Sequence, residues 1–248
     1  AARMRFAVDK WWRGGISPAL NDGRLVIDRG DYYALFELLH AVRDNLNIDL
    51  RQSSPAYFKE LPNALVLSYY PAPYPAAENL YRIPAARTMG EPDLQRAALA
   101  RAAELALVAY DPNAQPTQFL QGWLIHDQFL LRGPFGIVYE FLWANPYLPG
   151  LSYYHLPLAF HDPTFGRLYL RSSWEDDAEW LGWINGELQV FKNGRPRIVE
   201  NPASSNAFQV GDATVVLVQS PARFEVSQPD AKILFVLGLK PDRAYEIE

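Results

Sequence analysis

The chain has 248 residues, of which 49% are hydrophobic and 21% are charged, a composition typical of a folded soluble protein and not of a disordered chain. Its net charge is -5, from 23 Lys and Arg against 28 Asp and Glu, and the basic residues are scattered, so we expect no nucleic-acid partner. The sequence contains no Cys and no apolar stretch of the roughly 20 residues that a membrane span needs. Thiol chemistry, zinc–thiolate sites and a membrane span are therefore excluded.

The first part of the chain, residues 1–150, is predicted to be a helical domain because its apolar residues recur at helical spacing. The clearest helix covers 32–46, with Asp31 in position to cap the first turn. One face of this helix is apolar and consists of Tyr32, Leu35, Phe36, Leu39, Val42 and Leu46. We therefore expect that face to be buried.

Further helices are expected in the same part. Ser54 and Pro55 provide the capping residue and the first-turn proline that start a helix, and Pro62 is expected to kink or restart it. Two more helices are predicted over 92–110 and 117–131. Residues 70–90 lie between the helix that starts at Pro55 and the helix predicted over 92–110. They contain many prolines and are predicted to form a long ordered loop.

After about residue 151 the hydrophobic pattern changes to alternation, which predicts an antiparallel β-sandwich-like domain over 151–248. The strongest signal is a hairpin over 180–191 around Asn185-Gly186, because Asn-Gly supplies the positive φ angles of a tight turn. A second Asn-Gly pair predicts a third adjacent strand. More strands are expected at 213–218, 223–226, 233–239 and 244–247.

The first hairpin strand also predicts how the sheet is covered. Alternation places Trp180, Gly182 and Ile184 on one face and Leu181 and Trp183 on the other. Both faces carry large apolar groups. We therefore expect one face to be covered by a second sheet and the other by helices or by a partner chain.

The connection between the two parts is a candidate binding region. Residues 142–155 combine aromatic rings, a histidine and turn formers. Either Tyr153, Tyr154 and His155 contact a sugar by stacking and hydrogen bonding, or these rings pack the two parts together. No metal and no cofactor are predicted, because no metal-binding spacing occurs among the histidines, which are at positions 40, 126, 155 and 161.

A second candidate group is the run RSSWEDDA at 171–178. Arg171 is suited to hold the carboxylate of a uronic acid through two hydrogen bonds, with Trp174 stacking on the sugar ring. The alternative is that Arg171 pairs with an acidic residue at 175–177. These acidic residues do not fit a glycosidase pair, because adjacent carboxylates cannot flank a bond from both sides.

Two passages resemble the heparinase II/III-type polysaccharide lyases. The Asp-Gly pair at 22–23, followed by GDYY at 30–33 and an amphipathic helix, is similar to that family's tyrosine-bearing helix, and the run at 171–178 is similar to its first sandwich strand. The resemblance implies the end of an α/α toroid joined to a β-sandwich. It also implies β-elimination, with Tyr32 or Tyr33 acting as acid or base.

The resemblance further implies a histidine on the sandwich after this strand, but the chain has no histidine after His161. Either His155 or His161 takes that role, or elimination chemistry has been lost. The chain begins without a leader and ends within an alternating pattern at 244–248, so we expect a segment of a longer protein.

Two functions from different classes therefore remain open. The first is a periplasmic or secreted protein that acts on or binds a uronic-acid polysaccharide in a groove between the two parts. Its predicted catalytic residues are Tyr32, Tyr33 and His155, and its predicted binding residues are Tyr153, Tyr154, His161, Arg171 and Trp174. The second is a non-catalytic binding or structural subunit, whose C-terminal sheet edge a partner chain extends.

Overall fold

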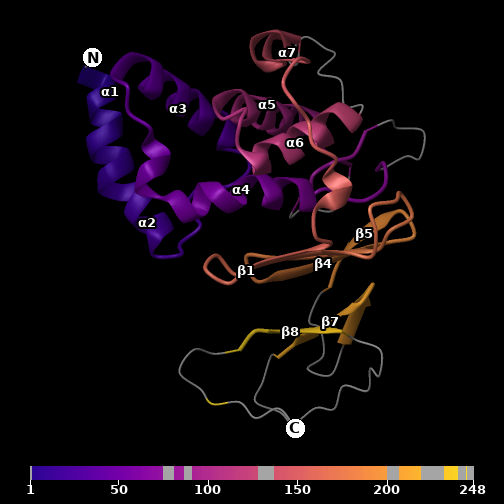
Figure 1. The fold of residues 1–248 in the computed structure, drawn as a ribbon. Coiled ribbons are helices and arrows are strands. Elements are labelled where there is room, and N and C mark those ends of the chain that lie inside the picture. The colour runs from indigo at the N-terminus through magenta and orange to yellow at the C-terminus, as the bar shows by residue number, and fades with distance from the viewer. Residues whose placement is uncertain are drawn as a thin grey trace.

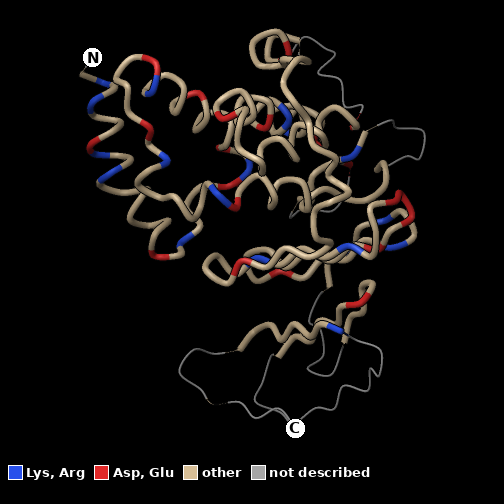
Figure 2. Tube along the Cα trace, viewed as in Figure 1, with Lys and Arg blue, Asp and Glu red and all other residues tan. Residues whose placement is uncertain are grey.

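The computed structural model describes residues 2–74, 81–86, 91–127, 137–199, 207–218, 232–239 and 244. These residues form three layers, in which helices cover one face of a five-stranded sheet and a three-stranded sheet lies on its other face (Figure 1). This combination of helices and sheets agrees with the predicted α+β class. Over the described trace, charged residues of both signs are spread through the layers and form no continuous basic stripe (Figure 2).

The helical elements occupy the chain up to residue 155. In chain order they are α1 (Ala2–Phe6), the π-helix η1 (Ala7–Ile16), α2 (Ser17–Asn21), α3 (Tyr32–Leu46), the 3-10 helix η2 (Leu50–Ser53), α4 (Pro55–Leu67), α5 (Leu94–Tyr110), α6 (Gln115–His126), α7 (Ile137–Trp143) and the 3-10 helix η3 (Tyr153–His155). The helix predicted over 32–46 is confirmed with its bounds. The predicted end of the fourth helix, residues 128–131, lies outside the described residues.

The strands follow in two sheets. The first contains β1 (Ala159–Asp162), β2 (Arg167–Arg171), β3 (Trp180–Ile184), β4 (Glu187–Lys192) and β5 (Arg195–Ile198), and the second contains β6 (Ala207–Val210), β7 (Ala213–Leu217) and β8 (Ile233–Leu237). All pairs of the first sheet are antiparallel. In the second sheet β6 and β7 are antiparallel, but β7 and β8 are parallel.

The prediction of a wholly antiparallel second part is therefore wrong for β7 and β8. Apolar alternation does not specify the direction of a strand, and the sequence between Leu217 and Ile233 is long enough for the crossover that parallel strands need. The strands predicted at 223–226 and 244–247 lie outside the described residues, apart from Ala244. The predicted C-terminal edge for a partner chain is outside them as well.

Two capping predictions are wrong, although both helices begin where expected. Asp31 precedes α3, but its backbone already has helical angles, and within the described structure its side chain accepts no bond from the first turn. Ser54 precedes α4, but its hydroxyl donates to Ser17 Oγ, 2.9 Å away in α2. A contact between distant segments thus replaces the expected local cap.

The α4 helix is continuous across Pro62, so the restart expected there is not observed. Pro62 and its neighbours Leu61 and Leu65 are buried. The helix packs against α6 and against the first two strands. Burial of this face compensates for the backbone hydrogen bond that proline cannot make.

The β3 strand confirms the predicted division of its side chains between two faces. Trp180 and Ile184 pack in one core cluster with the helices, whereas Leu181 and Trp183 pack in a second cluster between the two sheets. Trp180 is fully buried, and its Nε1 donates to the carbonyl oxygen of Leu67 at the end of α4, at 2.7 Å. The helices therefore cover one face of the first sheet, and the second sheet covers the other. The first cluster contains residues from both sides of residue 150, so the helical part and the first sheet share one core.

Both Asn-Gly turns are confirmed. Asn185 and Gly186 have φ angles of 51° and 81°, and Asn193 and Gly194 have φ angles of 53° and 73°. These turns join β3 to β4 and β4 to β5. Local sequence thus sets the register of three neighbouring strands.

We expect Gly186→Ala to lower the free energy of unfolding by about 1–2 kcal/mol, because alanine resists a positive φ. An added Cβ would meet no atom within 4 Å, so only backbone strain changes. Gly15→Ala is the matched control, since its added Cβ also meets nothing within 4 Å and Gly15 has no positive φ. Urea unfolding that shows equal midpoints for the two variants would contradict this account of the turn.

Candidate functional site

A cavity lies where the helices meet the first sheet. Its volume is about 260 Å³, and it is lined by the segment before α3, by α4 and α5, and by β2 and β3. Its polar lining consists of Asp28, Arg29, Tyr32, Ser68, Asp93, Arg96, Arg167, Tyr169 and Asn185. The three arginines of this lining supply N–H donors that suit an anionic ligand group.

Arg29 is held in the cavity wall by a buried carboxylate on α5. Its guanidinium donates to Glu104 and to Ser68 Oγ, and its Cζ lies 4.7 Å from the centroid of the Tyr69 ring. The Tyr69 hydroxyl donates to the other oxygen of Glu104 at 2.6 Å, and Glu104 is fully buried. The Nε of Arg29 is a buried donor that has no acceptor among the described residues.

Arg167 on β2 is a second arginine of the lining, and it is buried, whereas Arg29 is half-buried. It donates to Asp162 Oδ2 at 2.7 Å, directly across the β1–β2 pair. Its Nε is also a buried donor, and no described residue accepts from it. Alternation along β2 places Arg167, Tyr169 and Arg171 on the side that faces the helices. Arg29 and Arg167 are thus fixed in place, and each retains one unused N–H.

Tyr32 brings a hydroxyl group to the cavity. It accepts a hydrogen bond from the Tyr57 hydroxyl on α4, 3.1 Å away. Burial raises the pKa of Tyr57 well above its usual value and also raises the pKa of Tyr169, so both phenols keep their protons at neutral pH. Because Tyr57 donates to Tyr32, the Tyr32 oxygen keeps a fixed donor both as a phenol that donates to a ligand oxygen and as a phenolate that accepts a proton from the ligand.

The other predicted catalytic residues do not join Tyr32. Tyr33 contacts two residues of α7. Its hydroxyl accepts a hydrogen bond from Trp143 Nε1 at 3.2 Å, and its ring centroid lies 4.7 Å from that of Tyr139. Burial raises the pKa of Tyr33 to about 12. His155 is exposed at the end of η3. Of the three predicted catalytic residues, only Tyr32 belongs to the described lining.

The predicted binding residues also lie outside the cavity. Tyr153 and Trp174 are buried with ring centroids 5.2 Å apart, which fits the alternative in which these rings pack the two parts together. Tyr154 is exposed, and its ring packs at a tilt against that of Tyr153, with centroids 4.8 Å apart. His161 is exposed on β1, and its ring lies 5.5 Å from Phe235 in the second sheet.

Arg171 forms no salt bridge with any described acidic residue, so the pairing considered for 175–177 is not observed. Asp176 pairs with Arg82 instead. The Trp174 ring covers the Arg171 guanidinium, with 4.6 Å between its centroid and Cζ. Trp174 therefore stacks on the arginine and is not free to stack on a sugar.

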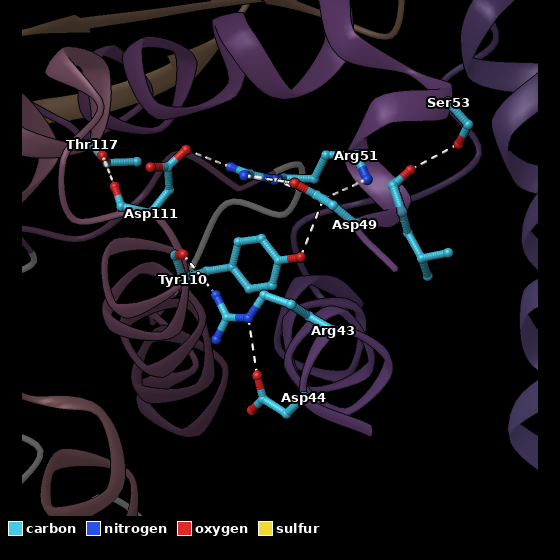
Figure 3. A network of polar contacts seen from close by, with 9 residues as sticks. Arg43, Asp44, Asp49, Arg51, Ser53, Tyr110, Asp111 and Thr117 are labelled. Atoms are coloured by element: carbon cyan, nitrogen blue, oxygen red, sulfur yellow. Dashed lines mark hydrogen bonds and ion pairs between the residues drawn. The ribbon is translucent and has the colours of Figure 1, made fainter. Parts of the chain in front are cut away.

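A separate polar network joins the ends of α3, η2 and α5 (Figure 3). Arg51 pairs with Asp49 at 2.9 Å and with Asp111 at 2.7 Å, and the Tyr110 hydroxyl donates to Asp49 at 3.1 Å. Burial raises the pKa of Asp49, but the hydrogen bonds from Arg51 outweigh burial and hold that pKa below its usual value. These groups satisfy one another, so we assign the network a structural role.

Four residues that shape the cavity were not identified by sequence reasoning: Arg29, Glu104, Asp162 and Arg167. One signal for them exists in the sequence. Arg101 and Glu104 are charged residues at buried positions of α5, whose other buried residues are mostly Ala, Leu and Val. A charge at such a position requires a buried partner, and that requirement points to an internal polar site.

Within the described ranges, no group of three or more His, Asp or Glu side chains is placed to hold a metal ion. No described helix is long and apolar enough to cross a membrane. Comparison of the chain with protein-family models, with curated proteins and with solved structures finds no match. Function therefore has to be inferred from the cavity and its residues.

Proposed function

We propose that the cavity binds a uronic acid residue of an acidic polysaccharide. The observation that carries this proposal is that one lining combines half-buried Arg29, buried Arg167 and the hydroxyl of Tyr32, and each arginine has a buried, unused Nε–H. Guanidinium groups bind carboxylates through strong charge-assisted hydrogen bonds. A volume of about 260 Å³ lies just below the usual range for ligand sites, about 300–1,000 Å³, and suits one sugar residue better than several.

The proposed reaction is β-elimination, as the resemblance to heparinase II/III-type lyases implies. Arg29 and Arg167 hold the carboxylate and stabilise the negative charge that develops when the neighbouring carbon loses its proton. Tyr32, in its phenolate form, takes this proton and passes it to the leaving glycosidic oxygen, and the Tyr57 hydroxyl and the two guanidiniums stabilise that phenolate. The carbon–oxygen bond breaks and a carbon–carbon double bond forms within the sugar, so the step needs no oxidant and no water.

The same resemblance supplies the finer description of the fold that we propose. The helical layer belongs to an α/α toroid, and the two sheets form a β-sandwich. Support comes from the apolar cluster that the two sheets share and from the cluster that joins the helices to the first sheet. The periplasmic or secreted location expected for a polysaccharide-degrading protein is part of this proposal.

The second candidate function is a non-catalytic binding or structural subunit. One observation favours it, because the described lining of the cavity includes no histidine. His40 is buried with its Nε2 2.9 Å from the Ala106 carbonyl oxygen, whereas His155 and His161 are exposed outside the cavity. In this case the cavity binds the acidic sugar and releases it unchanged.

Incubation with a panel of uronic-acid polysaccharides distinguishes the two candidates. We expect the absorbance of an unsaturated sugar to appear, and Tyr32→Phe to reduce its rate by about 10²–10⁴-fold, because this change removes only the proposed acid–base group. Tyr33→Phe is the matched control, since the same hydroxyl is lost next to the site but outside the cavity. We expect it to leave the rate unchanged.

Each outcome of this experiment decides a specific point. Product formation that persists in Tyr32→Phe contradicts the role of Tyr32. Saturable binding of uronic-acid oligosaccharides without product supports the second candidate. A panel that yields neither binding nor product contradicts both a lyase and a sugar-binding subunit, and leaves a structural subunit.

A further inference from the structure

Arg171 is a buried cation whose charge no described residue balances. Arg171 is 2% exposed, and both its Nη1 and its Nη2 are buried donors without an acceptor among the described residues. Its Nε donates to the Ser173 carbonyl oxygen at 3.2 Å. The hydrogen-bonding end of the guanidinium, which presents two parallel N–H groups, is therefore unused.

The surroundings of Arg171 add positive charge. Burial and the like charge of Arg82 lower the pKa of Arg171 to about 10, so it is still protonated at neutral pH. The only carboxylate that pairs with Arg82 in the described structure is Asp176, whose side chain is 64% exposed. Two guanidiniums thus share one partly hydrated carboxylate, which leaves an excess positive charge in a largely buried place.

Three aromatic rings complete the surroundings. Trp174 covers one face of the Arg171 guanidinium, and Tyr153 packs edge-on against Trp174, with centroids 5.2 Å apart. The Tyr154 ring packs at a tilt against Tyr153, with centroids 4.8 Å apart, and Tyr154 is 47% exposed. Trp174 occupies one face of the guanidinium and the unused donors lie at its Nη1–Nη2 edge, so that edge is where a ligand would bind, and Tyr154 is the exposed ring near it.

We infer that Arg171 and Arg82 form a second site, which binds a carboxylate group end-on through Nη1 and Nη2 of Arg171 once Tyr154 moves aside. A carboxylate matches the two parallel N–H groups and supplies the charge that the site lacks. A buried cation without a counterion is unstable, so the protein gains by binding an anion there. The site does not overlap the described lining of the cavity, and either site can exist without the other.

The test uses a variant in which the cavity is filled. Ala97 lines the cavity on α5 and Arg171 is not part of the described lining, so we expect the added ring of Ala97→Phe to fill the cavity and leave Arg171 unchanged. In this variant we expect isothermal titration to detect binding of sodium glucuronate and of sodium acetate, at constant ionic strength set with chloride. Tighter binding of glucuronate than of acetate identifies a uronic acid as the ligand, whereas equal binding identifies any small carboxylate.

Adding Arg171→Met to this variant should abolish the binding and should not lower the melting temperature in chloride, because it removes an unbalanced buried charge. Arg171→Lys, which keeps the charge but loses the paired N–H groups, should raise the dissociation constant by about tenfold or more. Arg24→Met is the control, since Arg24 is exposed and should leave binding unchanged.

Two results overturn the inference. One is the absence of carboxylate binding in folded Ala97→Phe. The other is binding that survives Arg171→Met, or, if that variant does not fold, binding of equal strength in Arg171→Lys. Neither result depends on whether the cavity itself binds a sugar, because the cavity is filled throughout.

Discussion

Glu104→Gln is expected to lower the free energy of unfolding by about 3–5 kcal/mol, the usual cost of removing one partner from a buried ion pair. Glu104 is fully buried, bonds to Arg29 and to the Tyr69 hydroxyl, and lies 3.8 Å from Arg101. The substitution keeps the size of the side chain but removes the carboxylate that pairs with Arg29, whereas Arg101 retains its ion pair with Asp127. The midpoint of urea unfolding measures the effect.

Glu37→Gln is the matched control for this prediction. Glu37 is exposed on α3, so the same chemical change should alter stability by less than about 0.5 kcal/mol. Equal unfolding midpoints for the two variants would show that the Glu104 carboxylate does not hold Arg29. The rigid placement of Arg29 in the cavity wall would then have no support.

Trp180→Ala is expected to cost about 3–5 kcal/mol, as truncation of a large buried ring usually does. Trp180 joins the sheet to the helices through its hydrogen bond to Leu67, and its ring packs 5.4 Å from that of Tyr70. Gly182 makes room for the indole, because a Cβ at that position would lie 2.3 Å from Trp180 Cη2. Truncation therefore leaves a cavity between two layers rather than at a surface.

Trp11→Ala provides the comparison for Trp180→Ala. The same atoms are removed, but Trp11 is partly exposed on η1, so we expect a much smaller loss of stability. Thermal or urea unfolding of the two variants measures the difference. A loss for Trp180→Ala no larger than that for Trp11→Ala would mean that the helical layer is not anchored to the sheet at this point.

The elements that sequence predicts correctly are those that local chemistry determines. The apolar spacing of 32–46 predicts α3 with its bounds, and the two Asn-Gly pairs predict the turns that join β3, β4 and β5. The faces of β3 follow from alternation alone. In each case neighbouring residues in the chain contain the whole signal.

Contacts between distant segments explain the predictions that are wrong. The α4 helix continues across Pro62 because the residues on either side of the proline are buried against other elements. Sequence rules for proline consider only neighbouring residues and do not include this burial. The parallel pairing of β7 and β8 depends on the path of the connection, and alternation does not encode that path. Ser54 bonds to Ser17 instead of capping its own helix for the same kind of reason.

The candidate site is predicted by sequence only at Tyr32. Arg29 and Glu104 are 75 residues apart in the chain, and nothing near either residue specifies the other. Arg167 lies just before the run RSSWEDDA at 171–178 and shares a strand face with Arg171. Its partner Asp162 can be identified only when the pairing of β1 with β2 is known. When side chains that are distant in the sequence come together only in the fold, the sequence shows at most one charged residue at an otherwise apolar position.

We propose that the cavity between the helices and the first sheet binds a uronic acid. A crystal structure of the protein with a saturating uronic-acid oligosaccharide tests this proposal. We expect one sugar residue in the cavity, with its carboxylate within hydrogen-bonding distance of the Arg29 or Arg167 guanidinium and a sugar oxygen within reach of the Tyr32 hydroxyl. An empty cavity under these conditions, or a sugar bound only elsewhere, would contradict the proposal.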